Sequence, residues 1–151
     1  PLRASLLEQA PLPPEQIHAM PVEEADLEAA ARSYARTLEK IAGTPLVLDL
    51  AHLGLGPDGH TASLVPNDPV LDVVNRDVAL TGLYQKRRRM TLTYPVINRA
   101  RRILWLVIGA EKTGMLVRLR NADVSIPAGR IRQEQALVLA DRAGVGESID
   151  K

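Results

Sequence analysis

Apolar side chains recur at every third or fourth position over residues 23–42, the spacing of one face of a helix. The stripe consists of Leu27, Ala31, Tyr34, Leu38 and Ile41. Gly43 follows, and glycine commonly stands just past the end of a helix, so the pattern predicts a helix over 23–42. Upstream, residues 1–10 resemble the end of another helix. Residues 11–21 predict a proline-rich connector with a short extended piece around Ile17.

Two largely apolar runs lie farther along the chain, over 45–55 and 100–110. Each contains a glycine near its end, and such runs are typical of parallel strands that are covered on both faces. Val and Thr at strand-like spacing predict two further strands, over 77–83 and 90–94.

The second apolar run is followed by a helical pattern over 111–121, and a final apolar stretch over 136–141 predicts the last strand. Strands and helices therefore alternate, which indicates an α/β fold with a mostly parallel sheet and helices on both faces. The length fits one ordinary domain, so we interpret 1–151 as a single domain. In this architecture ligands bind outside the carboxyl ends of the strands.

The loop that follows the first apolar run, within LGLGPDGHTASLVP, is rich in glycine. Gly54, Gly56 and Gly59 allow tight turns and bring backbone N–H groups close to a ligand, because no Cβ blocks the approach. Such a loop can hold an oxyanion or a phosphate. It is not the dinucleotide-binding fingerprint, which requires a helix that opens directly from the glycines. Asp77 lies near the offset of a ribose-binding acid, but it begins a predicted strand, and we interpret this spacing as chance.

Asp58 and His60 lie two residues apart in this loop, so an extended turn would direct both side chains into one cleft. Histidine is the side chain best suited to exchange protons at neutral pH, which makes His60 a candidate general base, and Asp58 is expected to orient either His60 or the water. A second interpretation is that residues 57–59 form an ordinary β-turn and His60 caps the next helix. Thr61 and Ser63 fit a helix cap as well, and Ser63 lacks the GxSxG elbow of a serine nucleophile.

The composition of the chain excludes several classes of ligand and catalytic site. The chain has 19 basic and 18 acidic residues, a formal net charge of +1, so no global charge draws it to nucleic acid or to an anionic membrane. There is no cysteine, which excludes disulfides, a thiolate zinc site and a cysteine nucleophile. His18 and His52 have no partner at metal-ligand spacing, so we expect no metal. No apolar run reaches the roughly 20 residues that span a bilayer, and we expect a soluble, cytoplasmic protein.

The stretch LGLGPDGHTASLVP closely resembles the signature of the 6-phosphogluconolactonase family, which is grouped with the glucosamine-6-phosphate isomerases and deaminases. The resemblance continues through RRMTLTYPVINRARRILWLVIGAEKTGML. There a Thr-Leu-Thr strand, a proline, Asn98 and Arg99, an apolar strand, and a glycine followed by Lys112 occur in the family's order. It implies a three-layer, modified Rossmann-like fold and a sugar-phosphate lactone hydrolase of the pentose phosphate pathway, with no metal and no cofactor.

The deaminase branch has a similar loop with glycine, Asp and His, but its loop continues as GHIAFNEP, with an acidic side chain five residues beyond the histidine. Val65 occupies that position here, and valine cannot carry a proton. Lactonases typically have SLFP where this chain has SLVP, a change that keeps an apolar wall. The departure from the deaminase pattern favours the lactonase branch, with an amino-sugar-phosphate isomerase or deaminase as the alternative.

The resemblance covers roughly the C-terminal two-thirds of the family. A first strand, a glycine- and serine-rich phosphate loop and an acidic-Arg motif have no counterpart here. We therefore expect either a fragment, with the N-terminal part missing, or a truncated relative, including a non-catalytic sugar-phosphate-binding domain. Missing strands would leave a sheet edge or an apolar face bare.

The resemblance assigns roles to single residues. His60 takes a proton from the water that attacks the lactone carbonyl, and loop N–H groups over the range Gly56 to Gly59 stabilise the oxyanion. Lys112 begins a helix on the same sheet edge and holds the phosphate, unless it is a solvated surface lysine. The basic tract 86–89 has no interleaved aromatic residues and predicts a solvated loop rather than a nucleic-acid patch. Only Arg89, at a strand edge, is expected near the sugar phosphate. The expected partner is the small-molecule lactone alone, and the sequence predicts no oligomeric state.

Overall fold

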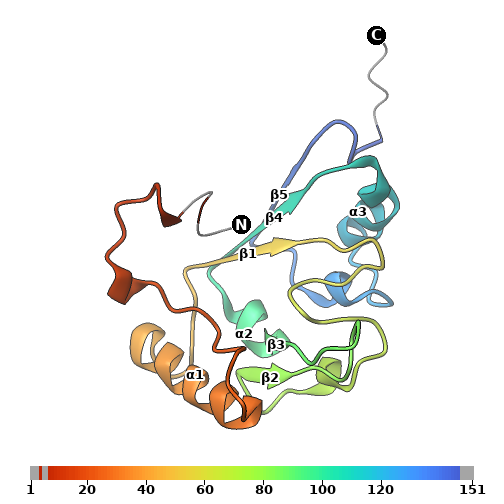
Figure 1. Ribbon diagram of the computed structural model, residues 1–151. Helices are drawn as coiled ribbons and strands as arrows, with labels where there is room; N and C mark the ends of the chain where they lie inside the picture. The colour runs from red at the N-terminus through yellow and green to blue at the C-terminus, as the bar shows by residue number, and fades with distance from the viewer. Residues whose placement is uncertain (1–3, 5–6, 147–151) are drawn as a thin grey trace.

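The structure, a computed structural model, describes residue 4 and residues 7–146 (Figure 1). The helix end expected over residues 1–10 lies partly outside the described residues. The longer elements are α1 (Leu27–Ala42), β1 (Leu50–Gly54), β2 (Val78–Leu80), β3 (Met90–Leu92), α2 (Tyr94–Arg99), β4 (Arg102–Val107), α3 (Thr113–Arg120) and β5 (Ala136–Ala140). Four short 3-10 helices join them: η2 (Pro14–Gln16), η3 (Pro69–Asp72), η4 (Ala110–Lys112) and η5 (Pro127–Arg130).

The main sheet is parallel and has the strand order β1-β4-β5 (Figure 1). Gly54, the last residue of β1, lies opposite Leu106 near the end of β4, so the two strands end at the same edge. A second, antiparallel pair is formed by β2 and β3. An α/β fold with a parallel sheet is confirmed, and each predicted strand is present, with shorter bounds than the sequence suggested.

Only one face of the main sheet is covered within the described residues. Ile103, Trp105 and Val107 of β4 point into the core, where they meet side chains of α2 and α3. The opposite face carries exposed apolar side chains: Leu50, Leu106, Leu137 and Leu139. The expectation of strands covered on both faces is therefore wrong for this part of the chain, because alternate side chains of a strand point to opposite faces and the helices lie on one of them. The expected bare apolar face is present.

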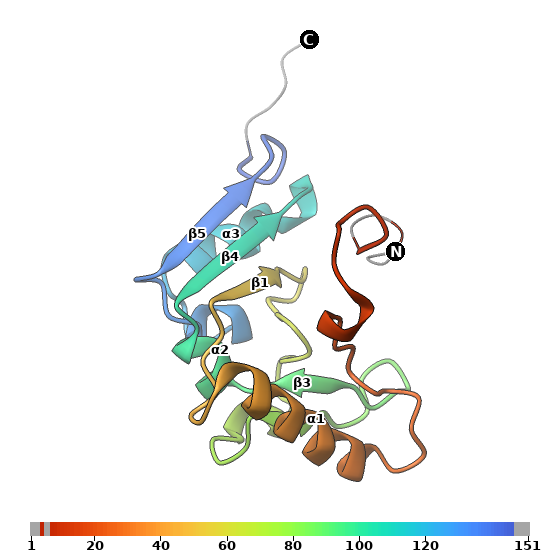
Figure 2. The ribbon, with the colours of Figure 1, turned by 90° about the vertical axis from the view of Figure 1, so that its left-hand side faces the viewer.

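Helix α1 lies against the small antiparallel pair and not against the main sheet (Figure 2). Ala30 and Ala31 pack there on Val78 and Met90. The helix begins at Leu27, the first residue of its apolar stripe, and not at residue 23, because the Asp26 carboxylate accepts a hydrogen bond from the Ala29 N–H group at 2.9 Å and caps the first turn. It ends where predicted, at Gly43, which has a φ of +85°.

Helix α2 was not predicted by the sequence pattern, which extends a strand through this region. β3 ends at Leu92, and Thr93 and the following Tyr94 begin a short helix with a proline in its first turn. At its end Arg99 pairs with Asp77 at 2.7 Å and donates from Nε to the Leu46 carbonyl at 3.1 Å. Arg99 therefore ties the end of α2 to the segment before β1 and to Asp77, its ion-pair partner.

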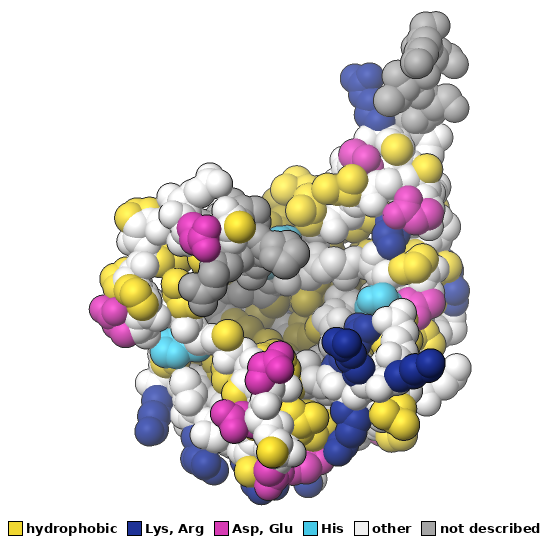
Figure 3. All heavy atoms as spheres, in the orientation of Figure 1, with side chains coloured by type: hydrophobic (Ala, Val, Ile, Leu, Met, Phe, Trp, Pro, Cys, Tyr) yellow, Lys and Arg dark blue, Asp and Glu magenta, His cyan; other side chains and the backbone are white. Residues whose placement is uncertain are grey.

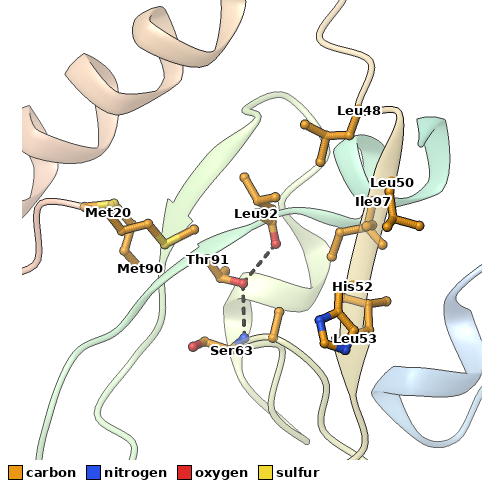
Figure 4. A pocket seen from close by; sticks show the side chains of 12 residues that line it. Met20, Leu48, Leu50, His52, Leu53, Ser63, Met90, Thr91, Leu92 and Ile97 are labelled. Carbon is orange, nitrogen blue, oxygen red and sulfur yellow. Dashed lines mark hydrogen bonds between the residues drawn. The ribbon is translucent and has the colours of Figure 1, made fainter. Parts of the chain in front are cut away.

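An apolar hollow of about 330 Å³ lies between β1 and β3 (Figure 4). Met20, from the connector before α1, reaches it from one side and Leu50 from the other. His52 also lines this hollow. Figure 3 shows hydrophobic side chains on the same hollowed face of the molecule. Among the described residues, no helix is long and apolar enough to cross a membrane.

Candidate active site

The loop after β1 is a closed turn. The Gly59 N–H group donates to the Gly56 carbonyl at 3.0 Å, and the Gly56 N–H group donates to the His60 carbonyl at 2.8 Å. Gly59 has a φ of +82°, a conformation that favours glycine. The β-turn expected over residues 57–59 is therefore present. No helix follows directly, since Thr61 and Leu64 form a β-bridge and η3 begins only at residue 69, so the helix-capping roles of His60, Thr61 and Ser63 are wrong.

Asp58 and His60 form a pair at the rim of the loop. The Nδ1 atom of His60 lies 2.6 Å from Oδ1 of Asp58, and the His60 backbone N–H group donates to the same oxygen at 3.1 Å. The side chains are 24% and 38% exposed for His60 and Asp58, so the pair is partly sheltered but open to solvent. The expected convergence of the two side chains is thus present in the structure.

The ionisation of Asp58 fixes the tautomer of His60. Burial raises the pKa of the Asp58 carboxyl, but hydrogen bonds from the His60 backbone and side chain, with the attraction of His60, lower it more, so the pKa lies below its ordinary value. The carboxylate is then ionised at neutral pH and can only accept. Nδ1 must carry the shared hydrogen, which leaves the lone pair of Nε2 free in the neutral ring.

Two of the loop glycines serve the loop itself. A Cβ on Gly56 would lie 2.1 Å from Nδ1 of His60, so the imidazole rests against the bare backbone at this residue. A Cβ on Gly59 would meet the Ile126 side chain at 2.7 Å. Their N–H groups are already used, as donors to the His60 and Gly56 carbonyls. Each of these two N–H groups has one hydrogen, and the turn occupies it, so an oxyanion would need another donor of the loop; the oxyanion role of the loop stays a prediction.

Gly54 differs from the other two glycines. An added Cβ would meet no atom of the described chain within 4 Å, since the residue faces open space. It lines a hollow of about 330 Å³ together with His60 and Lys112. Packing against neighbouring side chains therefore explains the glycines at positions 56 and 59, but it does not explain the glycine at position 54.

Lys112 reaches this hollow from the next strand along the sheet. It follows β4 in η4 and takes the N-cap position of α3. Its side chain is 18% exposed, and Nζ lies 3.8 Å from Oε1 of Glu111. The placement of Lys112 beside the His60 loop follows from the parallel pairing of β1 and β4, which brings both carboxyl ends to one edge. The predicted shared edge is confirmed.

Arg89 lies on the far side of a tyrosine that the sequence analysis missed. The Arg89 guanidinium carbon is 4.6 Å from the centroid of the Tyr84 ring, and its Nη2 donates to Gln85 at 2.7 Å. Tyr84 in turn lies against His60, with ring centroids 6.1 Å apart. Arg89 does not line the hollow of His60 and Lys112. No pattern in the sequence indicates Tyr84, because its hydroxyl contacts Asp58, which lies 26 positions earlier in the chain.

The other predicted histidines take no part in the site. His52 lies on β1 at the apolar hollow, and His18 offers its carbonyl oxygen to the Tyr34 hydroxyl at 3.0 Å. In the part of the chain that the structure describes, no group of three or more His, Cys, Asp or Glu residues is placed to hold a metal ion.

Comparison with known proteins identifies the family of the chain. Residues 1–139 match the family model of glucosamine-6-phosphate isomerases/6-phosphogluconolactonase. The chain belongs to this family.

Several relatives carry the name 6-phosphogluconolactonase. The protein from Synechocystis is 43% identical over 114 residues, which cover 73% of this chain and 47% of that protein. The protein from Rattus norvegicus is 37% identical over 139 residues, which cover 86% of this chain and 52% of that protein. The chain spans about half the length of these curated relatives.

A solved structure shows the same fold over part of its length. The crystal structure of 6-phosphogluconolactonase from Thermotoga maritima superposes with a TM-score of 0.78 at 28% identity, and covers 92% of this chain and 62% of that one. The chain thus has an α/β fold with a small parallel sheet that matches part of the solved structure, and the three-layer, modified Rossmann-like architecture stays a prediction.

Proposed function

We propose that this chain contains the catalytic residues of a 6-phosphogluconolactonase. This enzyme hydrolyses 6-phospho-D-glucono-1,5-lactone to 6-phospho-D-gluconate in the oxidative branch of the pentose phosphate pathway. The observation that carries the proposal is the Asp58–His60 pair, in which Nδ1 is held at 2.6 Å and the ring lines a hollow shared with Lys112. The names of relatives at 37–43% identity support the same activity.

In the proposed reaction, the free Nε2 atom of His60 removes a proton from a water molecule as the water oxygen bonds to the lactone carbonyl carbon. The tetrahedral intermediate then collapses, and the bond between that carbon and the ring oxygen breaks. The ring oxygen leaves with the proton held by His60. One water is consumed, and the products are a carboxylic acid and a hydroxyl group on the same chain.

Asp58 stabilises the imidazolium that forms in the first step and keeps the ring oriented. The substrate phosphate is proposed to lie near Lys112, whose ammonium group would gain the counterion that Glu111 supplies only weakly at 3.8 Å. Arg89, whose guanidinium lies over the Tyr84 ring, is proposed as a second cation near the sugar phosphate. The carbonyl oxygen requires donors other than the N–H groups of Gly56 and Gly59, because both are engaged.

The alternative within the family is an amino-sugar-phosphate isomerase or deaminase. Val65 is 2% exposed and takes the position of the acidic side chain in that branch, so the corresponding proton transfer has no group here. An alternative from another class is a sugar-phosphate-binding domain without turnover. It would use Gly54 and Lys112 for the phosphate and leave His60 idle.

Three measurements separate these proposals. Turnover of the lactone above its spontaneous hydrolysis, and none of glucosamine-6-phosphate, supports the lactonase. The reverse result supports the isomerase or deaminase. Saturable binding of 6-phosphogluconate with no turnover of either compound supports the binding domain and contradicts the lactonase assignment for this chain.

A further inference from the structure

Tyr84 makes three contacts that converge on the candidate site. Its hydroxyl lies 3.4 Å from Oδ2 of Asp58, the oxygen that His60 does not use. Its ring meets the His60 imidazole at an interplanar angle of 61°, an edge-to-face arrangement. The Arg89 guanidinium lies over its face at 4.6 Å. One side chain thus touches an acid, a base and a cation.

The backbone around Tyr84 holds it in this place. Tyr84 and Arg87 form an isolated β-bridge, with N–H to carbonyl distances of 2.9 and 3.1 Å in the two directions. Gln85 and Lys86, between them, have positive φ values of 51° and 62°. Two consecutive non-glycine residues in that region form a tight turn at the tip of the β2–β3 ribbon. The turn directs Tyr84 toward the loop after β1.

We propose that Tyr84 is a positioning residue for the Asp58–His60 pair. Its hydroxyl donates to Oδ2 of Asp58, so both carboxylate oxygens have a partner and the carboxylate cannot rotate away from Nδ1. Its ring limits the rotation of the imidazole and keeps Arg89 on the outer side. This inference rests on the proposed lactonase function for its kinetic readout, but its structural readout does not require turnover.

Two substitutions separate the hydroxyl from the ring. Tyr84→Phe removes the hydrogen bond and keeps the edge contact with His60 and the face for Arg89. Tyr84→Leu removes all three. Tyr34→Phe is the matched control, because the Tyr34 hydroxyl also donates to one oxygen, the His18 carbonyl, but lies away from the site.

The first readout is the tautomer of His60, followed by ¹⁵N NMR of the ring nitrogens at a pH where the imidazole is neutral. In the parent and in Tyr34→Phe, Nδ1 should carry the hydrogen. In Tyr84→Phe the population with the hydrogen on Nε2 should rise, and in Tyr84→Leu it should rise further. Unchanged ring-nitrogen shifts in both folded Tyr84 variants would overturn the positioning role, whether or not the protein hydrolyses the lactone.

The second readout is steady-state kinetics with the lactone. Loss of one net hydrogen bond corresponds to about 2- to 10-fold in rate, so Tyr84→Phe should lower kcat by that factor with little change in KM. Tyr84→Leu should lower kcat further and raise KM, because Arg89 loses its platform. A lower kcat together with a shifted tautomer supports the proposal. An unchanged kcat in Tyr84→Phe and Tyr84→Leu contradicts it. If no variant, including the parent, turns over lactone, the proposed function fails, and the NMR result alone decides the role of Tyr84.

Discussion

The junctions after β1 and β4 occupy equivalent positions at the carboxyl edge of one parallel sheet, yet they carry different chemistry (Figure 1). At each junction an aspartate organises backbone N–H groups. Asp58 accepts from His60 in its own turn, whereas Asp141 accepts from Gly109 at 3.1 Å and from Gly144 at 2.7 Å. Asp58 also holds the imidazole.

The difference lies in what each aspartate holds. The first junction fixes an ionisable ring with a free nitrogen. The second fixes only backbone, from which the Lys112 cation extends. The edge of a parallel sheet therefore supplies position alone, and the side chains beside it decide the role. Substitutions at the first junction should lower the rate of the chemical step, and substitutions at the second should weaken substrate binding.

Among changes that leave His60 itself intact, Gly56→Ala should have the largest effect. The new Cβ would lie 2.1 Å from Nδ1 of His60, so the ring must leave its place and lose Asp58. Because a positioned base contributes about 10²–10⁴-fold, kcat should fall at least tenfold. Gly54→Ala is the control: its Cβ meets no described atom within 4 Å, so stability should not change. A normal kcat in folded Gly56→Ala would contradict the assigned ring position.

Lys112→Met should come next and act on the other junction. Methionine keeps the length of the side chain without the charge, and hydrogen bonds to a charged group contribute about 1.5–3 kcal/mol, so KM for the lactone should rise at least tenfold. The change in kcat should be smaller. Lys40→Met, at the exposed end of α1, is the control and should keep the parental KM. A selective loss of kcat in Lys112→Met would erase the contrast between the junctions.

The smallest expected effect is on the pH dependence of the free energy of unfolding. The folded-state pKa of Asp58 is lowered, so its contribution to stability is present above the ordinary carboxyl pKa of about 4 and is lost as pH falls through the folded-state value. The stability difference between the parent and Asp58→Asn should therefore shrink as the pH falls below about 4. Urea unfolding at several pH values measures it.

A second aspartate does not disturb that comparison. The Ser125 hydroxyl and Arg118 lower the pKa of Asp123 to about 2, but Asp123 is present in both proteins and its effect cancels. Asp49→Asn removes an aspartate that is exposed and paired with Arg101, and it serves as the control. A stability difference that grows on acidification in Asp58→Asn would contradict the sign of the shift.

The sequence predicted the strands and the shared edge because both depend on local patterns. Apolar runs identify β1 and β4, and parallel pairing then places Lys112 beside the His60 loop without further information. Helix α2 was missed because six residues that contain a proline show no helical period. The bare face of the sheet was predicted from the family motifs that have no counterpart here and not from β1, whose apolar run fits a strand covered on both faces.

Within the site, the types of residue were predictable but their hydrogen-bond partners were not. The Asp58–His60 pair follows from a two-residue spacing in a turn. The use of the Gly56 and Gly59 N–H groups within that turn depends on backbone geometry that glycine leaves open. Tyr84 depends on the packing of a distant ribbon tip against the loop, which no local pattern records.

The central claim is that His60 is the general base, and the turnover rate of His60→Asn tests it most directly. Asparagine keeps a polar side chain of similar reach and removes the titratable nitrogen, so the variant should remain folded and bind 6-phosphogluconate. After subtraction of spontaneous lactone hydrolysis, its kcat should be about 10²–10⁴-fold below that of the parent, with a much smaller change in KM. A folded His60→Asn variant that keeps more than about a tenth of the parental kcat would contradict the assignment and make Asp58 the next residue to test.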